Sequence, residues 1–366
     1  MTPLKRLEGL AKRALALLAA ALLFRPGRRA RAPGQLARAR RILLVRIDDR
    51  VGEALLLTPL LSTLKTRAPP AEVHALVHAR CLRVLDGHPA LDGLHALDRA
   101  ALALGPLAPG IRTLRRLGPW DAVVDCGNWE IPAVTSALVS RLVAGPAPVV
   151  GPAVWPTGLL HDVRIEARPD TRSEVAQRLH VLSPLGEVRP VSRLSFRTPR
   201  PRPALGALLA EVRAAPHAVV LPGGRLGWRR IPPGAFAAAA GALASEGRRP
   251  VVAWGPGEDA LARAVVGAVP DAVLAPPTDL DDLAALLAAA GCTVCNNSGP
   301  LHLSVAVGAP TLGLFLRMDP GRWGYPGPPH RMVDLTAEAE AGQPLEALVA
   351  EQSTRFARGL ATPGSR

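Results

Sequence analysis

Residues 296–302, NNSGPLH, gather small polar side chains between a short apolar run and a helix-like stretch. Ser298 is typical of a helix N-cap, Gly299 lets a ligand approach the backbone, and Pro300 suits the first helical turn. Unpaired N–H groups at a helix start, together with the helix dipole, favour a diphosphate there. His302 follows one turn later and could touch the same ligand. A capped helix without a ligand is the alternative interpretation.

Residues 221–236, LPGGRLGWRRIPPGAF, place three arginines beside a glycine turn, at Arg225, Arg229 and Arg230. Guanidinium groups bind phosphate oxygens through two parallel hydrogen bonds. This turn is therefore a second candidate for holding a diphosphate. Ordinary surface arginines are the alternative.

Residues 251–265, VVAWGPGEDALARAV, contain the order G-P-G-E-D-A after an apolar run, the minimal form of a dinucleotide-binding fingerprint. Pro256 removes a backbone donor from that loop, so we interpret the turn differently. Glu258 could accept hydrogen bonds from both hydroxyl groups of a ribose. A glutamate stabilised by the dipole of a helix start is the alternative.

Residues 46–61, RIDDRVGEALLLTPLL, crowd Asp48, Asp49 and Glu53 around Gly52 ahead of a helix-like stretch. A carboxylate aimed into a cleft can act as a general base toward a hydroxyl group. The alternative is that these acidic residues only stabilise a helix start through the helix dipole.

Two further patterns resemble metal or redox motifs. Asp279-Leu280-Asp281 is a D-x-D, which many sugar transferases use for Mg²⁺ or Mn²⁺, but it opens DLDDLAALLAAAG. We therefore predict that it caps a helix, and we expect no metal. Cys292 and Cys295 form a C-x-x-C that ends a β-prone run, whereas redox pairs usually start a helix. We expect these thiols to be buried and structural.

Apolar strand-like runs alternate with helix-like stretches from Arg41 onward. The runs lack a clean apolar–polar alternation, which is typical of parallel strands covered by helices on both faces. They form two series, at residues 41–47, 72–78, 121–126 and 148–151, and at residues 217–222, 250–255, 271–276, 292–296 and 310–315. The sequence therefore predicts an α/β protein with two Rossmann-like domains whose parallel sheets face each other across a cleft. Ligands of such sheets bind beyond the carboxyl ends of the strands, where the four turns above fall.

A Pro- and Arg-rich passage separates the two series and disfavours regular structure. A chain of 366 residues is also too long for one ordinary core. We therefore predict five segments: a basic, partly apolar N-terminal segment at residues 1–40, a Rossmann-like domain at 41–195, an interdomain linker at 196–216, a second Rossmann-like domain at 217–335, and a terminal helix and tail at 336–366.

The positive charge of the chain is concentrated at its N-terminus. Residues 1–41 hold eleven Lys or Arg residues against one acid, Glu8, a net charge of +10, which leaves +4 of the total +14 for the other 325 residues. The body shows no basic stripe or nucleic-acid motif, so we expect no nucleic-acid partner. Residues 14–24, ALALLAAALLF, are too few to span a bilayer. They predict a helix lying on an anionic membrane surface, or a basic leader without structural consequence.

Taken together, these turns resemble glycosyltransferase family 9, the lipopolysaccharide heptosyltransferases. The segment ILLVRIDDRVGEALLLTPLL is similar to the family's opening strand and loop, LPGGRLGWRRIPPGAF to its phosphate loop, and AWGPGE to its G-G-P-x-E turn. NNSGPLHLSVAVGAPTLGLF is similar to the signature D-S-G-P-x-H-x-A-x-x-x-G-x-P-x-x-x-x-F, the most specific part. The resemblance covers about residues 42–330. It implies a GT-B fold in which the second domain holds the nucleotide-sugar donor and the first holds the acceptor.

The resemblance also implies roles for single residues. Glu53 stands where the family has its catalytic Asp. The implied donor-binding residues are Arg225 and Arg229 at the phosphates, Glu258 at the ribose, Ser298, Gly299 and Pro300 at the diphosphate turn, and Asn297 and His302 at the signature's Asp and His. Two departures matter, because Glu53 lengthens the reach of the base and Asn297 removes a charge near the sugar. Asp48 or Asp49 could be the working base instead.

By this resemblance the protein is an inverting, metal-independent glycosyltransferase without a cofactor. It would move a sugar, heptose, from a nucleotide-diphosphate donor, ADP-heptose, to a lipid-linked glycan of the lipopolysaccharide core or a related acceptor. The expected location is cytoplasmic, peripheral on the inner face of the inner membrane. Two other functions stay open: a catalytically drifted nucleotide-sugar-binding protein of the same fold, and a nucleotide-sugar epimerase.

Overall fold

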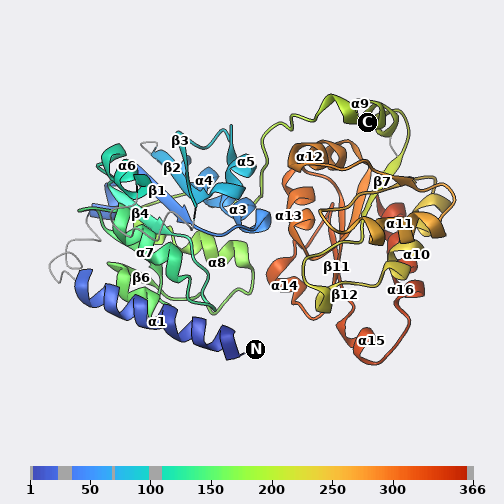
Figure 1. The fold of residues 1–366 in the computed structure, drawn as a ribbon. Coiled ribbons are helices and arrows are strands. Elements are labelled where there is room, and N and C mark those ends of the chain that lie inside the picture. Colours follow the sequence, from blue (N-terminus) through green and yellow to red (C-terminus); the bar gives the residue numbers. More distant parts are fainter. Residues whose placement is uncertain (1–2, 24–34, 68–70, 99–108, 361–366) are drawn as a thin grey trace. The chain divides into compact units, whose positions relative to one another are not determined.

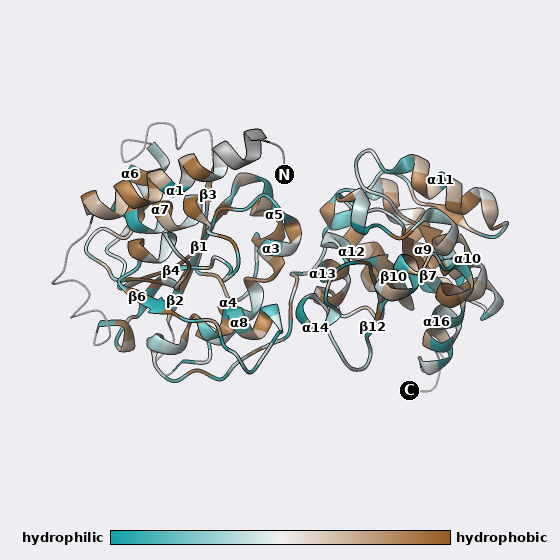
Figure 2. Ribbon diagram, turned by 90° about the horizontal axis from the view of Figure 1, so that it is seen from below, coloured by the Kyte–Doolittle hydropathy of each residue, from teal (hydrophilic) through white to brown (hydrophobic). Residues whose placement is uncertain are grey.

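The computed structural model describes residues 3–23, 35–67, 71–98 and 109–360 (Figure 1). The chain divides into two compact units, Met1–Arg193 and Leu194–Arg366. Each unit has its own parallel sheet, and its core consists of apolar strand residues together with the helices packed on them. Figure 2 shows the apolar residues gathered in the strands inside each unit.

The sheet of the first unit has six parallel strands in the order β3-β2-β1-β4-β5-β6. The strands are β1 (Arg41–Arg46), β2 (Glu72–His78), β3 (Gly93–Leu97), β4 (Ala122–Asp125), β5 (Val149–Pro152) and β6 (Val163–Ile165). The central strand β1 is buried from its second residue onward, as expected with helices on both faces. β3 and β6 are additional to the predicted strands, because both are short and carry a polar residue within the apolar run.

Helices cover this sheet on both sides. They are α1 (Pro3–Leu23), α3 (Val51–Leu55), α4 (Thr58–Leu64), α5 (Leu82–Leu85), α6 (Pro109–Leu117), α7 (Val134–Val143) and α8 (Glu174–His180), with short 3₁₀ turns that include η1 (Ala79–Cys81) and η3 (Thr157–Leu160). α1 packs against η3 and α7. Among the described helices, none is both long and apolar enough to cross a membrane.

The second unit repeats this plan, with six parallel strands in the order β12-β11-β10-β7-β8-β9. The strands are β7 (His217–Leu221), β8 (Arg249–Val252), β9 (Val273–Leu274), β10 (Cys292–Asn296), β11 (Thr311–Phe315) and β12 (Arg331–Asp334). Its helices are α9 (Gly206–Ala214), α10 (Pro233–Ser245), α11 (Asp259–Ala268), α12 (Leu280–Ala289), α13 (Gly299–Ala306), α14 (Pro320–Trp323), α15 (Thr336–Glu340) and α16 (Leu345–Gly359), with the 3₁₀ turn η6 (Gly227–Arg229) after β7. All five predicted strands are present, and β12 is additional.

The passage at residues 196–216, expected to be a linker, lies within the second unit and contains α9. Arg197 makes two hydrogen bonds to Asp281 of α12, at 2.6 and 2.9 Å, and both side chains are buried. This charge-assisted pair attaches the passage to α12. The expected single terminal helix consists of α15 and α16, and α16 packs on α10.

Each sheet has one topological switch point, where the order of winding reverses. In the first unit the chain winds outward from β1 in one direction and from β4 in the other, so the loops after β1 and β4 leave the sheet as neighbours. In the second unit the corresponding neighbours are the loops after β7 and β10. Open α/β sheets bind ligands at such points, beyond the carboxyl ends of the strands.

Candidate functional site

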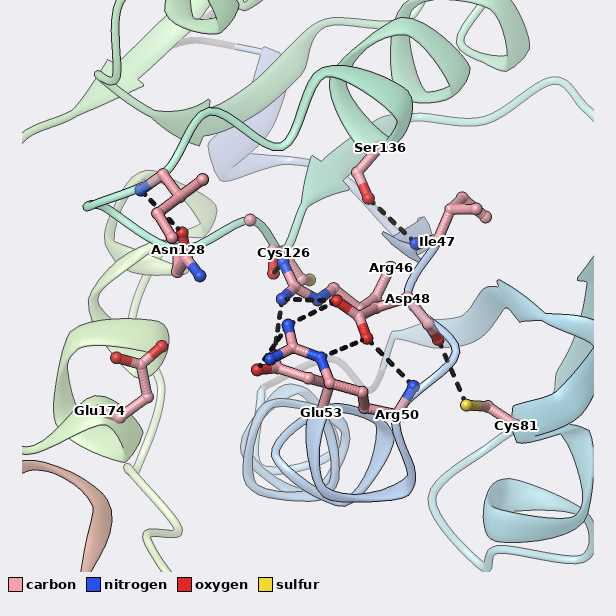
Figure 3. Close-up of polar contacts among 12 residues, drawn as sticks. Arg46, Ile47, Asp48, Arg50, Glu53, Cys81, Cys126, Asn128, Ser136 and Glu174 are labelled. Atoms are coloured by element: carbon pink, nitrogen blue, oxygen red, sulfur yellow. Dashed lines mark hydrogen bonds and ion pairs between the residues drawn. The ribbon is translucent and has the colours of Figure 1, made fainter. Parts of the chain in front are cut away.

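The loop between β1 and α3 is held from two sides at the switch point of the first unit (Figure 3). The backbone N–H of Ile47 donates to Ser136 Oγ of α7 at 3.0 Å. The thiol of Cys81 donates to the carbonyl oxygen of Asp48 at 3.2 Å. These bonds come from elements distant in sequence, and they give the carboxylates of this loop defined positions.

Glu53, in the first turn of α3, is buried among arginines. Its Oε2 accepts hydrogen bonds from Arg46 at 2.6 Å and from Arg178 at 2.5 Å, and its Oε1 lies 3.2 Å from Arg50 Nη2. Glu53 is only 4% exposed, and Arg46 and Arg178 are 3% and 1% exposed. Arg178 also donates to Glu174, one turn earlier on α8, at 3.0 Å. Glu53 is therefore the shared counter-charge of three guanidinium groups.

These neighbours determine the proton affinity of Glu53. Burial alone would raise its pKa, but the guanidinium groups of Arg178, Arg46 and Arg50 hold the pKa well below its ordinary value. A carboxylate with a strongly lowered pKa is a weak proton acceptor. The residue predicted to be the general base thus lies at the start of α3, directly after the expected loop, and its ion pairs with three arginines make it poorly suited to accept a proton.

The two other carboxylates of the loop have different partners. Burial would raise the pKa of Asp48, but the hydrogen bonds and charge of Arg50, together with Arg46, lower it. Asp48 accepts from Arg50 Nε at 2.8 Å and from Arg50 Nη2 at 2.7 Å. Asp49 is 39% exposed, and its contact with Arg80 Nη1 of η1 is long, at 3.9 Å. Asp49 is therefore the carboxylate of this loop that a ligand from solvent reaches most easily.

A buried histidine–carboxylate pair supports the neighbouring loop after β4. His161 Nε2 lies 3.0 Å from Asp125 Oδ2, and its Nδ1 lies 3.1 Å from the carbonyl oxygen of Pro152. Asp125 Oδ1 accepts the N–H of Gly127 at 3.2 Å, which fixes the start of the loop. A Cβ at Gly151 would collide with the imidazole ring. This pair is not predictable from the sequence, because its members are 36 residues apart and no local pattern marks them.

At the switch point of the second unit, Asn296 ties the loops after β10 and β7 together. Its side chain accepts the N–H of Ile231 at 3.0 Å and donates to the carbonyl oxygens of Pro222 and Gly223, both at 2.9 Å. Asn296 is 2% exposed, so it fixes the two loops and does not face solvent. The Asn-Asn doublet in the sequence was its only signal.

The turn after Asn296 begins α13 as predicted, but without the predicted side-chain cap. Ser298 occupies the N-cap position with extended backbone, and Pro300 lies in the first turn. Ser298 Oγ donates to the carbonyl oxygen of Asn296 at 3.3 Å and accepts no N–H from the helix. The N–H of Asn297 donates to Leu314 on β11 at 3.0 Å, which anchors the turn to the sheet. A helix start without a side-chain cap suits an anion.

Glu258 joins the loops after β7 and β8. Its Oε1 accepts the N–H of Gly224 at 2.7 Å, and its Oε2 accepts the N–H of Gly255 at 3.1 Å. Each carboxylate oxygen can accept a second hydrogen bond, so a ribose hydroxyl remains a possible donor. A Cβ at Gly223 would collide with this carboxylate, which explains why the β7 loop carries glycine there.

Replacing Gly223 by Ala is expected to displace the Glu258 carboxylate and to weaken both of its backbone hydrogen bonds. Hydrogen bonds to charged groups contribute about 1.5–3 kcal/mol each, so the free energy of unfolding should fall by at least about 1.5 kcal/mol. Urea unfolding followed by circular dichroism measures this change. Gly241→Ala is the matched control, because Gly241 lies within α10 with no atom within 4 Å of its added Cβ. An equal effect of the two substitutions would contradict the role of Glu258.

Three arginines lie at the same edge of the second sheet. Arg225 is exposed and Arg229 is partly buried, and both follow β7. Arg317 follows β11 and has a left-handed backbone, with φ 55°. Its N–H donates to Thr336 Oγ1 at 2.7 Å, and its Nη1 donates to the carbonyl oxygen of Trp228 at 3.4 Å. Non-glycine residues in this conformation cluster at functional sites, and residue type alone does not reveal them.

His302 is held by a tyrosine that the sequence analysis did not consider. His302 Nδ1 lies 2.5 Å from the hydroxyl group of Tyr325, and the two rings meet edge to face. His302 is 7% exposed in the second turn of α13. The contact fixes the ring of His302 beside the helix start.

The D-x-D motif and the thiols have structural roles. Asp279 accepts the N–H of Asp282 and forms a capping box at the start of α12, which confirms the predicted cap. Cys292 and Cys295 are free and buried, as predicted, and burial raises the pKa of Cys292 to about 11. Within the residues that the structure describes, no cluster of three or more His, Cys, Asp or Glu side chains could hold a metal ion.

Comparison with known proteins gives two sequence matches. Residues 168–345 match the model of glycosyltransferase family 9 (heptosyltransferase). Over 291 residues, the chain is 25% identical to lipopolysaccharide heptosyltransferase 3 of Escherichia coli, an alignment that covers 74% of this chain and 82% of that protein.

Solved structures are also similar to the chain over most of its length. The glycosyltransferase family 9 protein from Veillonella parvula DSM 2008 has a TM-score of 0.71 at 19% identity, covering 88% of this chain and 97% of that one. The E. coli heptosyltransferase WaaC, solved with ADP, has a TM-score of 0.67 at 21% identity, covering 88% of this chain and 100% of that one. The predicted α/β architecture of GT-B type is confirmed.

Proposed function

From the match of residues 168–345 to the model of glycosyltransferase family 9, we propose that the chain is a member of that family and an inverting, metal-independent heptosyltransferase. The proposed donor is ADP-heptose and the proposed acceptor is a lipid-linked glycan of the lipopolysaccharide core. One observation supports this proposal most directly. At the switch point of each sheet lies a turn whose side chains suit one of the two substrates, the acceptor in the first unit and the donor in the second. Carboxylates gather at the first switch point, and arginines with an uncapped helix start gather at the second.

The second unit holds the donor in this proposal. The diphosphate binds the start of α13 at Ser298, Gly299 and Pro300, and Arg225 and Arg229 neutralise its charge. These preorganised donors would stabilise the leaving diphosphate without a metal ion. Support comes from the anchoring of the turn by Asn296 and of the β7 loop by Glu258, since a fixed site needs no reorganisation during the reaction.

The remaining donor contacts concern the nucleoside and the sugar. Glu258 would accept from the ribose hydroxyl groups while keeping its two backbone bonds. Asn297 and His302 would lie near the sugar, with His302 oriented by Tyr325. Asn297 supplies an uncharged amide where the family signature has an acid, so sugar recognition would depend more on hydrogen bonds than on charge.

The first unit supplies the base in this proposal. The resemblance of this loop to the family motif favours Glu53, but its buried contacts with Arg46 and Arg178 leave it poorly suited to accept a proton. We therefore assign proton transfer to Asp49, which is exposed on the same loop, and assign to Glu53 the positioning of the arginine cluster. Asp49 would take the proton of an acceptor hydroxyl group, and the oxygen would attack the anomeric carbon. The bond from that carbon to the diphosphate would break with its electron pair, so that ADP leaves and the configuration inverts.

This reaction would take place in the cytoplasm, at the inner face of the inner membrane, where a lipid-linked acceptor is embedded. The net charge of +10 in residues 1–41 supports attraction to anionic lipid.

A direct assay distinguishes this function from its competitors. Purified protein with ADP-heptose and extracted core acceptor is expected to yield a glycosylated lipid and ADP, measured by mass spectrometry. Binding of the donor without any product would favour the drifted binding protein. An isomerised nucleotide sugar without glycosylated lipid would favour an epimerase.

Replacing Arg229 by Ala is expected to weaken ADP binding by about 10- to 100-fold, because a charge-assisted contact contributes about 1.5–3 kcal/mol. Isothermal titration calorimetry with ADP measures the loss. Arg263→Ala is the matched control, since this arginine of α11 is 68% exposed and its ion pair within the described part of the chain, with Asp259, is long at 4.0 Å. Unchanged ADP affinity in the Arg229 variant would remove the phosphate role of this residue.

A further inference from the structure

The outward side of α1 carries an apolar stripe. Leu15, Leu18 and Leu22 are spaced i, i+3 and i+7, which places them on one face of a helix. They are 51%, 59% and 75% exposed. Among the described residues, eight large apolar side chains are strongly exposed, and five of them are leucines of α1. Such a concentration on one helix marks an interaction surface.

The opposite side of α1 is what holds the helix to the first unit. Ala16 is fully buried and Ala20 is 9% exposed, and Ala20 packs with Ala137 of α7 and Leu160 of η3. Figure 1 shows α1 lying along the first unit beside α7. Because small alanines make this contact, the leucines are not needed for docking α1. Their exposure therefore serves something outside the described fold.

A tryptophan lies close to the same element. Trp155 is 61% exposed and stands two residues before η3, the turn on which α1 packs. Tryptophan is enriched at the boundary between lipid and water, since its ring is apolar and its N–H is polar. Trp155 is therefore a further exposed apolar side chain in the segment that leads into the turn on which α1 packs.

We propose that the outward face of α1, made of Leu15, Leu18 and Leu22, and the neighbouring Trp155 dock on a bilayer that contains anionic lipid. This proposal rests on the proposed function, because a lipid-linked acceptor lies in such a bilayer. The +10 charge of residues 1–41 favours an anionic surface as the partner, because a second copy of this chain would bring an equally basic segment that repels the first. Apolar insertion and charge attraction add, as in other helices that lie in the interface.

α1 is attached to the same unit that carries the proposed acceptor site. α7, on which α1 packs, carries Ser136, and Ser136 Oγ accepts the N–H of Ile47 in the loop that holds Asp49. The bilayer would therefore be bound by the same rigid unit that binds the acceptor. Docking would raise the effective concentration of an embedded acceptor without a new contact to its sugar.

The test uses the full chain with the triple substitution Leu15→Ser, Leu18→Ser and Leu22→Ser. Its matched control changes the same leucines to methionine, which keeps apolar character and helix propensity. Co-sedimentation is measured with vesicles of phosphatidylethanolamine and phosphatidylglycerol, and with phosphatidylcholine vesicles for comparison. The serine variant should bind the anionic vesicles at least about 100-fold more weakly, because three leucines no longer insert.

Two activity measurements separate this surface from the proposed reaction. On an acceptor embedded in anionic vesicles, the serine variant should lose turnover in proportion to its lost binding, whereas on a deacylated, water-soluble acceptor it should match the wild type. Equal vesicle binding by the serine variant and the wild type would overturn the proposal. Concentration-dependent dimers that the serine variant abolishes, without vesicle binding by the wild type, would assign the surface to a second copy. A wild type that binds vesicles but glycosylates neither acceptor would leave the surface standing and refute the reaction.

Discussion

Asp49→Asn is expected to lower kcat by about 100- to 10,000-fold, the range that general-base catalysis contributes. The side chain keeps its size and its capacity to accept a hydrogen bond, but it can no longer take the proton of the acceptor hydroxyl group. Among the described residues, the ion pair of Asp49 is a long contact with Arg80, so the variant should fold normally. Single-turnover kinetics with ADP-heptose measures the loss, and ADP affinity should stay unchanged.

Asp170→Asn is a suitable control for the Asp49 variant, because Asp170 is an exposed aspartate of the same unit, 58% exposed and paired with Arg168. It should leave kcat unchanged. Full turnover by Asp49→Asn would reject Asp49 as the base while leaving the glycosyl transfer itself established. Absence of product from the wild type would instead reject the whole reaction, so the two failures are distinct.

Glu53→Gln is expected to destabilise the protein by about 3–5 kcal/mol at neutral pH. Removing one partner from buried ion pairs is strongly destabilising, and here it leaves the almost fully buried Arg46 and Arg178 with only Asp48 and Glu174 to balance their charge. Urea unfolding followed by circular dichroism measures the change. Glu351→Gln on α16 is the control, because Glu351 is 50% exposed and surface changes usually stay within about 0.5 kcal/mol.

The effect of Glu53→Gln should depend on pH in a defined direction. The folded protein holds the pKa of Glu53 below its ordinary value of 4.5, so its contribution to stability is complete above that pH and is lost as the pH falls below it. The difference between wild type and variant should therefore be largest near neutral pH and should shrink on acidification. A variant that is as stable as the wild type but inactive would return the role of base to Glu53.

These two predictions show where sequence reasoning stopped at this site. The loop after β1 was predicted as a catalytic element from its crowded carboxylates and from family resemblance. The choice among Asp48, Asp49 and Glu53 required Arg178, which is 125 residues distant in sequence from Glu53. No local pattern connects the two residues, because their contact depends on how α8 packs against α4, the helix that follows α3.

In the second unit, the sequence predicted where the turns lie, but it did not predict the partners of their individual side chains. The glycine, serine and arginine patterns correctly located the edge of the sheet, since strands and helix starts are encoded by short-range periodicity. The partners of single side chains did not follow. Ser298 was expected to cap α13 and donates instead to Asn296, while Glu258 links two loops that come from different strands. Arg317 and Tyr325 were not recognised at all.

The sequence by itself determined nine of the twelve strands that the structure describes, the parallel character of both sheets, and the positions of the four turns that carry the candidate ligand-binding residues. It could do so because apolar runs and turn residues act over a few neighbouring positions. Only the tertiary structure decided which carboxylate is buried against arginines, which asparagine is an internal tie, and which face of α1 stays exposed. Those properties depend on desolvation and on charges brought together from distant parts of the chain, and the order of residues along the chain does not specify them locally.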